Sequence, residues 1–146
     1  VGNWIGPLLV HAALNNVKRI LLLGYHGKLI KLAGGIFHTH HHLADARIEI
    51  LVFLALKANI PIGLIHKISK SNTIEDALIN LEKENIELVK KLWLLIANTI
   101  EFRALEYIKR YISNEVEVGA ALFDRKRSVR WIGTKAEAMF LKPDNF

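Results

Sequence analysis

The chain reads VKRILLLGYHGKLIKLAGG from residue 17 to residue 35, and this stretch predicts three elements in direct succession. Val17–Gly24 is short, apolar and ends at a glycine, which is typical of a buried strand. Tyr25–Gly27 reads as a turn, and Lys28–Ala33 has the spacing of a short helix that the two following glycines end. Ligands of open α/β sheets bind beyond the carboxyl ends of the strands. The stretch therefore indicates an α/β unit with a candidate ligand site at the junction of the strand and the helix.

Apolar periodicity predicts further elements on both sides of this stretch. The expected helices are Leu8–Asn16, Leu43–Ala58, Ile74–Glu84 and Ile86–Tyr111. Asn3 and Thr73 are the expected N-caps of the first and the third. Val116–Phe123 and Val129–Ile132 are expected to form a C-terminal hairpin, followed by a short tail from Gly133. Periodicity does not decide between helix, strand and loop for Ile36–His42, and it indicates a short element of undetermined type at Ile62–Ser69. We expect one domain over residues 1–146, an α/β fold that is a helix-rich, three-layer Rossmann-like unit with a small sheet.

The composition excludes several classes of protein. The chain has 146 residues, of which 51% are hydrophobic, so it can bury a core and is not intrinsically disordered. It contains no cysteine, which excludes disulfides, thiolate metal sites and cysteine nucleophiles. The longest apolar run, Ile50–Leu56, is far shorter than the roughly 18 residues that a membrane span needs. The first residues do not resemble a secretory signal, and we expect a cytoplasmic protein.

The positive charge is concentrated in the first half of the chain. The formal net charge is +6, and residues 1–72 carry eight Lys and Arg but only two Asp and Glu. All seven histidines also lie in this half. A concentrated positive field favours an anionic partner, such as a phosphate compound, a polycarboxylate or nucleic acid. The alternative is that these residues only keep the surface solvated.

Three cationic side chains are candidates for binding an anion. Lys28 and Lys31 are three residues apart and share one face of the expected helix. Arg47 stands beside an apolar run, where a guanidinium either pairs with a carboxylate of the protein or clamps one of a ligand. Asp45 and Glu49 are each two positions away and would point to other sides of a helix, so we expect any internal partner elsewhere in the fold.

The run His38-Thr39-His40-His41-His42 is the most unusual local feature. Neutral imidazoles bind metals and transfer protons near neutral pH. His38, His40 and His42 would share one face of a strand, with Asp45 nearby as a further ligand. The alternative is a polar loop, since the run lacks a spaced motif such as H-E-x-x-H.

Residues 24–47, GYHGKLIKLAGGIFHTHHHLADAR, resemble the signature of the CbiD family. The family pattern is G-x-x-G-K-x-x-K-L-A-x-G-x-F-x-T-H-x-x-x-A-D-x-R. The opening Gly2-Asn3-x-x-Gly6 and the stretch Val116–Asp124 are also similar, so the resemblance extends from Gly2 to about Phe140. The chain departs from the family at His41, His42 and Ala46, which argues against a metal triad of histidines.

The resemblance implies methyl transfer from S-adenosylmethionine to C-1 of cobalt-precorrin-5B, in anaerobic cobalamin biosynthesis. It implies that the chain is the C-terminal part of the enzyme and that the larger N-terminal domain is missing. The implied contacts to the substrate carboxylates are Lys28, Lys31, Thr39 and Arg47. The implied cofactor contacts are Gly2, Asn3, Gly6, Gly24 and Gly27. The implied catalytic or proton-handling residues are His38, His40 and Asp45. No metal ligand from the protein is implied, because the cobalt arrives inside the substrate.

Other functions stay open at this point. A histidine-centred metal hydrolase would hold a metal ion at the histidine run. A nucleic-acid binder would use the basic first half, but Trp4, Trp93 and Trp131 are scattered and do not interleave with the basic residues. The chain could also be a truncated fragment without activity of its own. We expect a cobalt-precorrin substrate and the missing N-terminal domain as partners, and neither nucleic acid nor a membrane.

Overall fold

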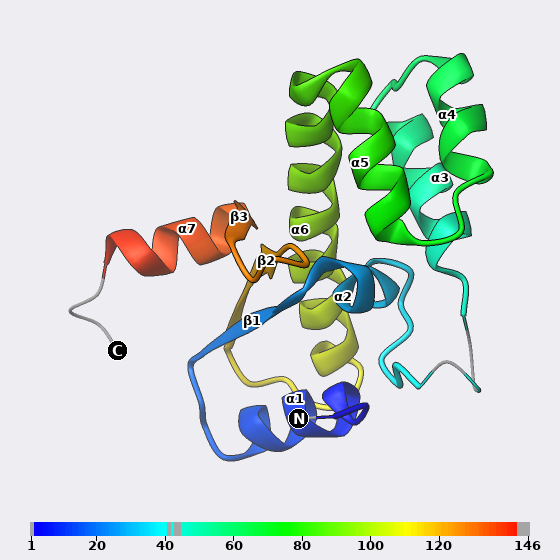
Figure 1. Ribbon diagram of the computed structural model, residues 1–146. Helices are drawn as coiled ribbons and strands as arrows, with labels where there is room; N and C mark the ends of the chain where they lie inside the picture. Colours follow the sequence, from blue (N-terminus) through cyan, green and yellow to red (C-terminus); the bar gives the residue numbers. More distant parts are fainter. Residues whose placement is uncertain (1, 41, 43–44, 143–146) are drawn as a thin grey trace.

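The computed structural model describes residues 2–40, 42 and 45–142 and confirms a mixed α/β fold. Its sheet has three strands among these residues: β1 (Arg19–Tyr25), β2 (Glu117–Phe123) and β3 (Val129–Ile132). The order is β1-β2-β3, with β1 parallel to β2 and β3 antiparallel to it. The strand predicted ahead of the glycine turn and the C-terminal hairpin are therefore confirmed (Figure 1).

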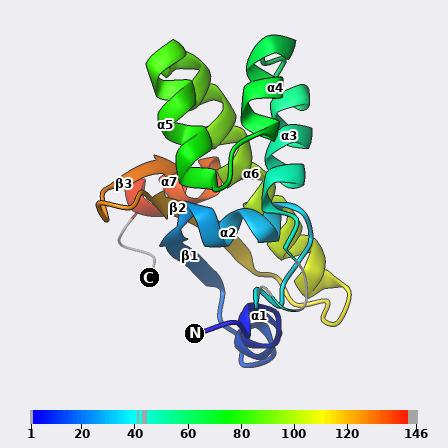
Figure 2. The same cartoon turned by 45° about the vertical axis from the view of Figure 1, so that its right-hand side comes forward.

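The described residues also form seven helices. They are α1 (Ile5–Leu14), α2 (His26–Ala33), α3 (Arg47–Lys57), α4 (Ile62–Ser69), α5 (Ile74–Glu84), α6 (Ile86–Lys109) and α7 (Thr134–Leu141). The long α6 runs through the middle of the molecule, with α3 to α5 beside its first half and the sheet beside its second half (Figure 1). Helix α2 lies between β1 and the α3–α5 helices (Figure 2). The apolar stripe of α6 therefore lies in the core and includes the fully buried Trp93.

Two of the helices begin at side-chain caps. The Thr73 hydroxyl accepts a hydrogen bond from the Asp76 backbone N–H at 3.0 Å, as the sequence predicts. The Asn85 side chain accepts from the N–H groups of Glu87 and Leu88 at the start of α6. These caps satisfy backbone donors that a helix cannot pair internally.

The beginnings of α1, α2 and α3 differ from the prediction. Strand β1 extends to Tyr25 and α2 begins at His26, so no separate turn lies between them. Asn3 does not cap α1, which begins after Trp4; its side-chain oxygen instead accepts a hydrogen bond from Thr39 Oγ1 at 3.2 Å. Helix α3 begins at Arg47 rather than at residue 43, and residues 43 and 44 lie outside the described residues. The segment around Thr39 is held by this contact with residue 3 and has no regular structure of its own.

The C-terminal segment is a helix and not the predicted tail. The buried carboxylate of Glu101 on α6 accepts hydrogen bonds from the N–H groups of Lys135 and Ala136, in the first turn of α7. It also accepts from the Ala120 N–H of β2 at 3.0 Å. The cap comes from a residue 34 positions earlier, so local sequence signals could not show it. Glu101 thereby joins α6, β2 and α7.

Candidate functional site

The carboxyl end of β1 and the start of α2 border a polar hollow of about 390 Å³, which we call the basic pocket. Its lining residues are Asn3, Tyr25, Gly27, Lys28, Lys31, Thr39, His40 and Arg47. They come from the segment before α1, the last residue of β1, helix α2, the segment after α2 and the first residue of α3. All four side chains predicted to bind substrate carboxylates therefore line one hollow, at the place that the strand–turn–helix pattern indicated.

The two lysines of the pocket are held differently. Lys31 is only 2% exposed, and its ammonium group donates a hydrogen bond to the Thr39 carbonyl at 3.1 Å. Lys28 is exposed on the same helix and forms no hydrogen bond or ion pair with any described residue. Since a buried cation needs a partner, Lys31 fixes the loop at Thr39 while Lys28 can reach a ligand.

Arg47 pairs with Asp45, contrary to the expectation that the two side chains point apart. Arg47 Nε and one terminal nitrogen donate to the two Asp45 carboxylate oxygens at 2.7 and 2.9 Å. The contact is possible because Asp45 precedes α3 and is not part of the helix. The hydrogen bond from Arg47 lowers the pKa of Asp45, and the same bond raises the pKa of Arg47. Asp45 is therefore an ionised anchor that orients the guanidinium at the rim of the basic pocket.

Tyr25, which the sequence did not single out, lies at the edge of the basic pocket. Its hydroxyl donates a hydrogen bond to the Glu75 carboxylate of α5 at 3.2 Å. Burial, followed by the charge of Glu75, raises the pKa of Tyr25 to about 12. The phenol is therefore a protonated hydrogen-bond donor at neutral pH.

Behind Tyr25, His26 occupies a closed network of hydrogen bonds. The indole N–H of Trp93 donates to His26 Nδ1 at 3.0 Å, and His26 Nε2 lies 2.7 Å from the same Glu75 carboxylate. Because an indole only donates, His26 Nδ1 is an acceptor and the ring carries its proton on Nε2. Burial lowers the pKa of His26, which keeps this ring neutral. Glu75 is 49 positions from His26, so no local pattern could have shown the network.

The fold places His38 apart from His40 and His42. His40 lines the basic pocket and stacks on His42, with ring centroids 4.9 Å apart. His38 packs edge-on against Trp4, and its buried Nδ1 has no hydrogen-bond partner among the described residues. His41 lies outside the residues that the structure describes. Over residues 2–40, 42 and 45–142, no three His, Asp or Glu side chains are grouped closely enough to hold a metal ion.

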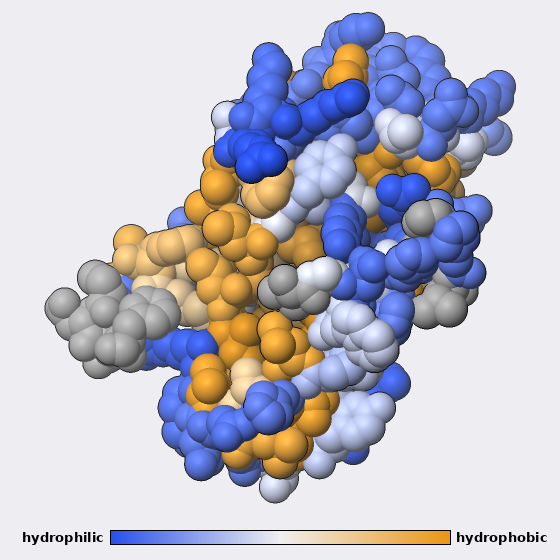
Figure 3. Space-filling view, turned by 60° about the horizontal axis from the view of Figure 1, so that its bottom comes forward, coloured by the Kyte–Doolittle hydropathy of each residue, from blue (hydrophilic) through white to orange (hydrophobic). Residues whose placement is uncertain are grey.

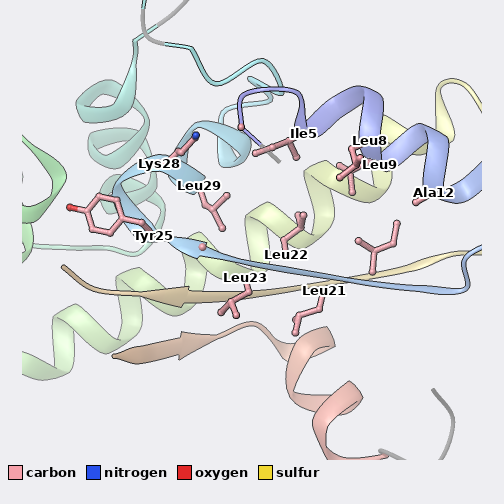
Figure 4. A pocket seen from close by; sticks show the side chains of 13 residues that line it. Ile5, Leu8, Leu9, Ala12, Leu21, Leu22, Leu23, Tyr25, Lys28 and Leu29 are labelled. Carbon is pink, nitrogen blue, oxygen red and sulfur yellow. The ribbon is translucent and has the colours of Figure 1, made fainter. Parts of the chain in front are cut away.

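Four of the five predicted cofactor residues divide between the basic pocket and a neighbouring apolar hollow of about 340 Å³, whereas Gly6 lines neither (Figure 4). Asn3 and Gly27 line the basic pocket, whereas Gly2 and Gly24 line the apolar hollow. Side chains of the protein already fill the space beside three of the glycines: Tyr107 at Gly6, Leu29 at Gly24 and Tyr25 at Gly27. Gly2 has a φ of +61° and no atom within 4 Å of its Cβ position, so it alone of these four opens onto free space.

A second basic surface lies on the hairpin of β2 and β3. Arg125, Lys126 and Arg127 are exposed at the tip of this hairpin. The Asp124 carboxylate holds the turn by accepting hydrogen bonds from the Lys126 and Ser128 N–H groups. Among the described residues, no helix is both long enough and apolar enough to cross a membrane.

Comparison with known proteins identifies the family. Residues 38–133 match the family model described as CbiD, C-terminal domain. A Prochlorococcus marinus subsp. pastoris protein (strain CCMP1986 / NIES-2087 / MED4) is 58% identical over 94% of this chain and 37% of its own length. A protein of Prochlorococcus marinus strain MIT 9515 is 60% identical over 91% of this chain and 36% of its own length. Both carry the name cobalt-precorrin-5B C(1)-methyltransferase, and this chain spans little more than a third of each. No solved structure matches. The chain therefore belongs to the CbiD family, and the resemblance seen in its sequence is confirmed.

Proposed function

We propose that this chain is the C-terminal part of a cytoplasmic methyltransferase that methylates C-1 of cobalt-precorrin-5B. The names of the relatives support the reaction. The observation that carries the assignment to this chain is the convergence of Lys28, Lys31 and Arg47 on one pocket at the end of β1. A second candidate is a fragment that is inactive without the rest of the enzyme. It is favoured because the chain spans only 37% of the length of the relative that is 58% identical.

The pocket suits a carboxylate of the substrate. A cobalt-precorrin carries acetate and propionate side chains around its ring, and these are anions at neutral pH. The exposed ammonium of Lys28 gives a charge-assisted hydrogen bond to such a group, and Arg47 is already oriented by Asp45. Thr39 and the Tyr25 hydroxyl add neutral polar groups to the same lining. Holding the ring by its periphery aligns C-1, which is the main contribution a protein makes to a transfer of this kind.

The histidines and Asp45 have supporting roles in this proposal. His40 holds or moves a proton near the bound ring from its place in the lining. His38 lies outside that lining and acts by keeping Trp4 in position. Asp45 acts through Arg47, and no proton transfer is assigned to it because the ion pair lowers its pKa.

We propose S-adenosylmethionine as the methyl donor, which supplies a methyl carbon on a positively charged sulfur. In the described part of the chain, side chains of the protein lie at the Cβ positions of Gly6, Gly24 and Gly27, so these three glycines are not open to an adenosyl group. We assign the contacts from this chain to Gly2 and Asn3, beside the basic pocket. The other three glycines allow close packing, and no step of the transfer is derived through the cofactor.

The remaining expectations on architecture belong to this proposal. We propose that residues 1–146 form one domain of the full enzyme and that this domain is a three-layer Rossmann-like unit with a small sheet. The parallel pairing of β1 and β2, with helices between them in sequence, supports this arrangement.

The test is a calorimetric titration of this chain with uroporphyrin, an octacarboxylate tetrapyrrole, at low ionic strength. We expect one-to-one binding that Lys28→Ala weakens about tenfold, since a charge-assisted hydrogen bond is lost. Lys91→Ala, which removes an exposed lysine from α6, is the matched control and should bind like the unchanged chain. Equal affinity of the two variants, or no binding by a chain that circular dichroism shows to be folded, would contradict the proposal.

A further inference from the structure

Strand β1 leaves an apolar face open to solvent. Leu23 is 58% exposed and Leu21 is 38% exposed, although both lie within a parallel strand. Leu21 pairs with Gly119, whose Cβ position faces Ala136, so the two leucines lie on the side of the sheet that α7 covers at β2. Parallel strands are normally buried on both faces. The side chains of β1 therefore indicate a missing layer.

The backbone of β1 also has a free edge. The Lys18 carbonyl, just before β1, accepts a hydrogen bond from the Glu117 N–H at 2.8 Å. The backbone N–H and C=O groups of the even-numbered residues of β1 therefore point toward β2. Backbone polar groups alternate along a strand, so Leu21 and Leu23 turn their N–H and C=O groups to the other side. In the described part of the chain β1 pairs with β2 alone. These groups can accept another strand.

Next to this edge lies the apolar hollow between α1 and β1. Figure 4 shows Ile5, Leu8 and Leu9 of α1 on one side of β1, with Leu21 and Leu23 projecting from its other side. Leu8 is itself half exposed. The space-filling view of the end of the molecule that carries α1 and β1 shows a broad hydrophobic area (Figure 3). The hollow has room, about 340 Å³, for apolar side chains of another element.

We infer that the rest of the CbiD polypeptide, outside the part matched by this chain, docks here and adds a strand along β1. The relatives contain nearly two further thirds of sequence, and the family model that matches is that of a C-terminal domain. Natural edge strands that face water are protected by charges, proline or bulges. From Ile20 to Tyr25 this edge has no charged residue and no proline.

A second copy of this chain fits the surface less well. A symmetric pair would place β1 against β1 and the same concave hollow on both sides, so neither hollow would receive a projecting side chain. A different domain has no such constraint. Tyr25 and Lys28 line both the apolar hollow and the basic pocket, so the docked domain would also border the substrate pocket.

Hydrogen–deuterium exchange tests this inference, which rests on family membership and not on the substrate proposal. The samples are this chain and the full-length Prochlorococcus marinus relative of 58% identity. In this chain the Leu21 and Leu23 amides should exchange within seconds. In the full-length relative, the amides aligned with them should exchange at least about 100-fold more slowly. The peptide aligned with α4 is the internal control and should exchange alike in both proteins.

Equal, fast exchange of the β1 edge amides in both proteins would overturn the inference. If the exchange of these amides in this chain becomes slower as the protein concentration rises, the inference is also overturned, because a second copy would then be the occupant. Either result leaves the uroporphyrin titration unaffected, so failure here is distinct from failure of the proposed function.

Discussion

Tyr25, His26 and Glu75 show how single residues fix the wall of the basic pocket. One Glu75 oxygen receives the Tyr25 hydroxyl and lies 2.7 Å from His26 Nε2. The Trp93 indole holds the other side of the imidazole. The sequence could show that the junction of β1 and α2 borders a site. It could not show this network, because its members are brought together only by the packing of α5 and α6 against α2.

The neutral state of His26 predicts a pH dependence of stability. Burial lowers its pKa in the folded chain, so the unfolded chain binds this proton more readily. The stabilising contribution is complete above the ordinary pKa of about 6.5 and is lost as the pH falls below it. Urea unfolding should show the free energy of unfolding falling from pH 7 to pH 5, by at most about 1.4 kcal/mol per pH unit from this group.

His26→Gln should make this slope shallower, because the group that titrates is gone. His66→Gln removes an exposed histidine of α4 and is the matched control, for which the original slope is expected. If His26→Gln does not fold, the pKa of His26 is measured by NMR from the imidazole signal of the unchanged chain. Titration of His26 at the same pH as the exposed histidines would refute the account.

Among the secondary-structure elements, β1, α5, α6 and the hairpin were predictable because their apolar periodicity and local caps agree. Helix α7 was not, since the carboxylate that completes its first turn belongs to α6. The irregular segment after α2 was not predictable from the sequence either. It is fixed by the buried Lys31 and by Asn3 rather than by its own sequence.

The role of Glu101 as a brace between elements gives a second prediction. Its carboxylate receives three backbone N–H groups, from Ala120, Lys135 and Ala136. Glu101→Gln keeps the size but turns an amide NH₂ toward one of these donors, and we expect a loss of about 2 kcal/mol in the free energy of unfolding. Glu115→Gln, at an exposed position, should change stability by less than about 0.5 kcal/mol. Similar urea midpoints for the two variants would mean that Glu101 is not a brace.

In the molecule as a whole, two surfaces lie side by side, and Tyr25 and Lys28 belong to both. The basic pocket offers cations to an anionic ligand, and the open edge of β1 offers an apolar face to another domain. The family signature predicted the first surface from residues 24–47 alone. The second could not be predicted, because exposure of Leu21 and Leu23 depends on which face of β1 the helices cover.

The most direct test of the carboxylate pocket is an NMR titration of the ¹⁵N-labelled chain with uroporphyrin. The hairpin tip at Arg125–Arg127 is a competing basic surface and provides an internal comparison. We predict saturable shifts of the Gly27, Lys28, Thr39 and Arg47 signals, with the hairpin signals unchanged. Shifts confined to residues 125–127, or spread over the surface without saturation, would contradict the claim that this chain binds the substrate carboxylates at the end of β1.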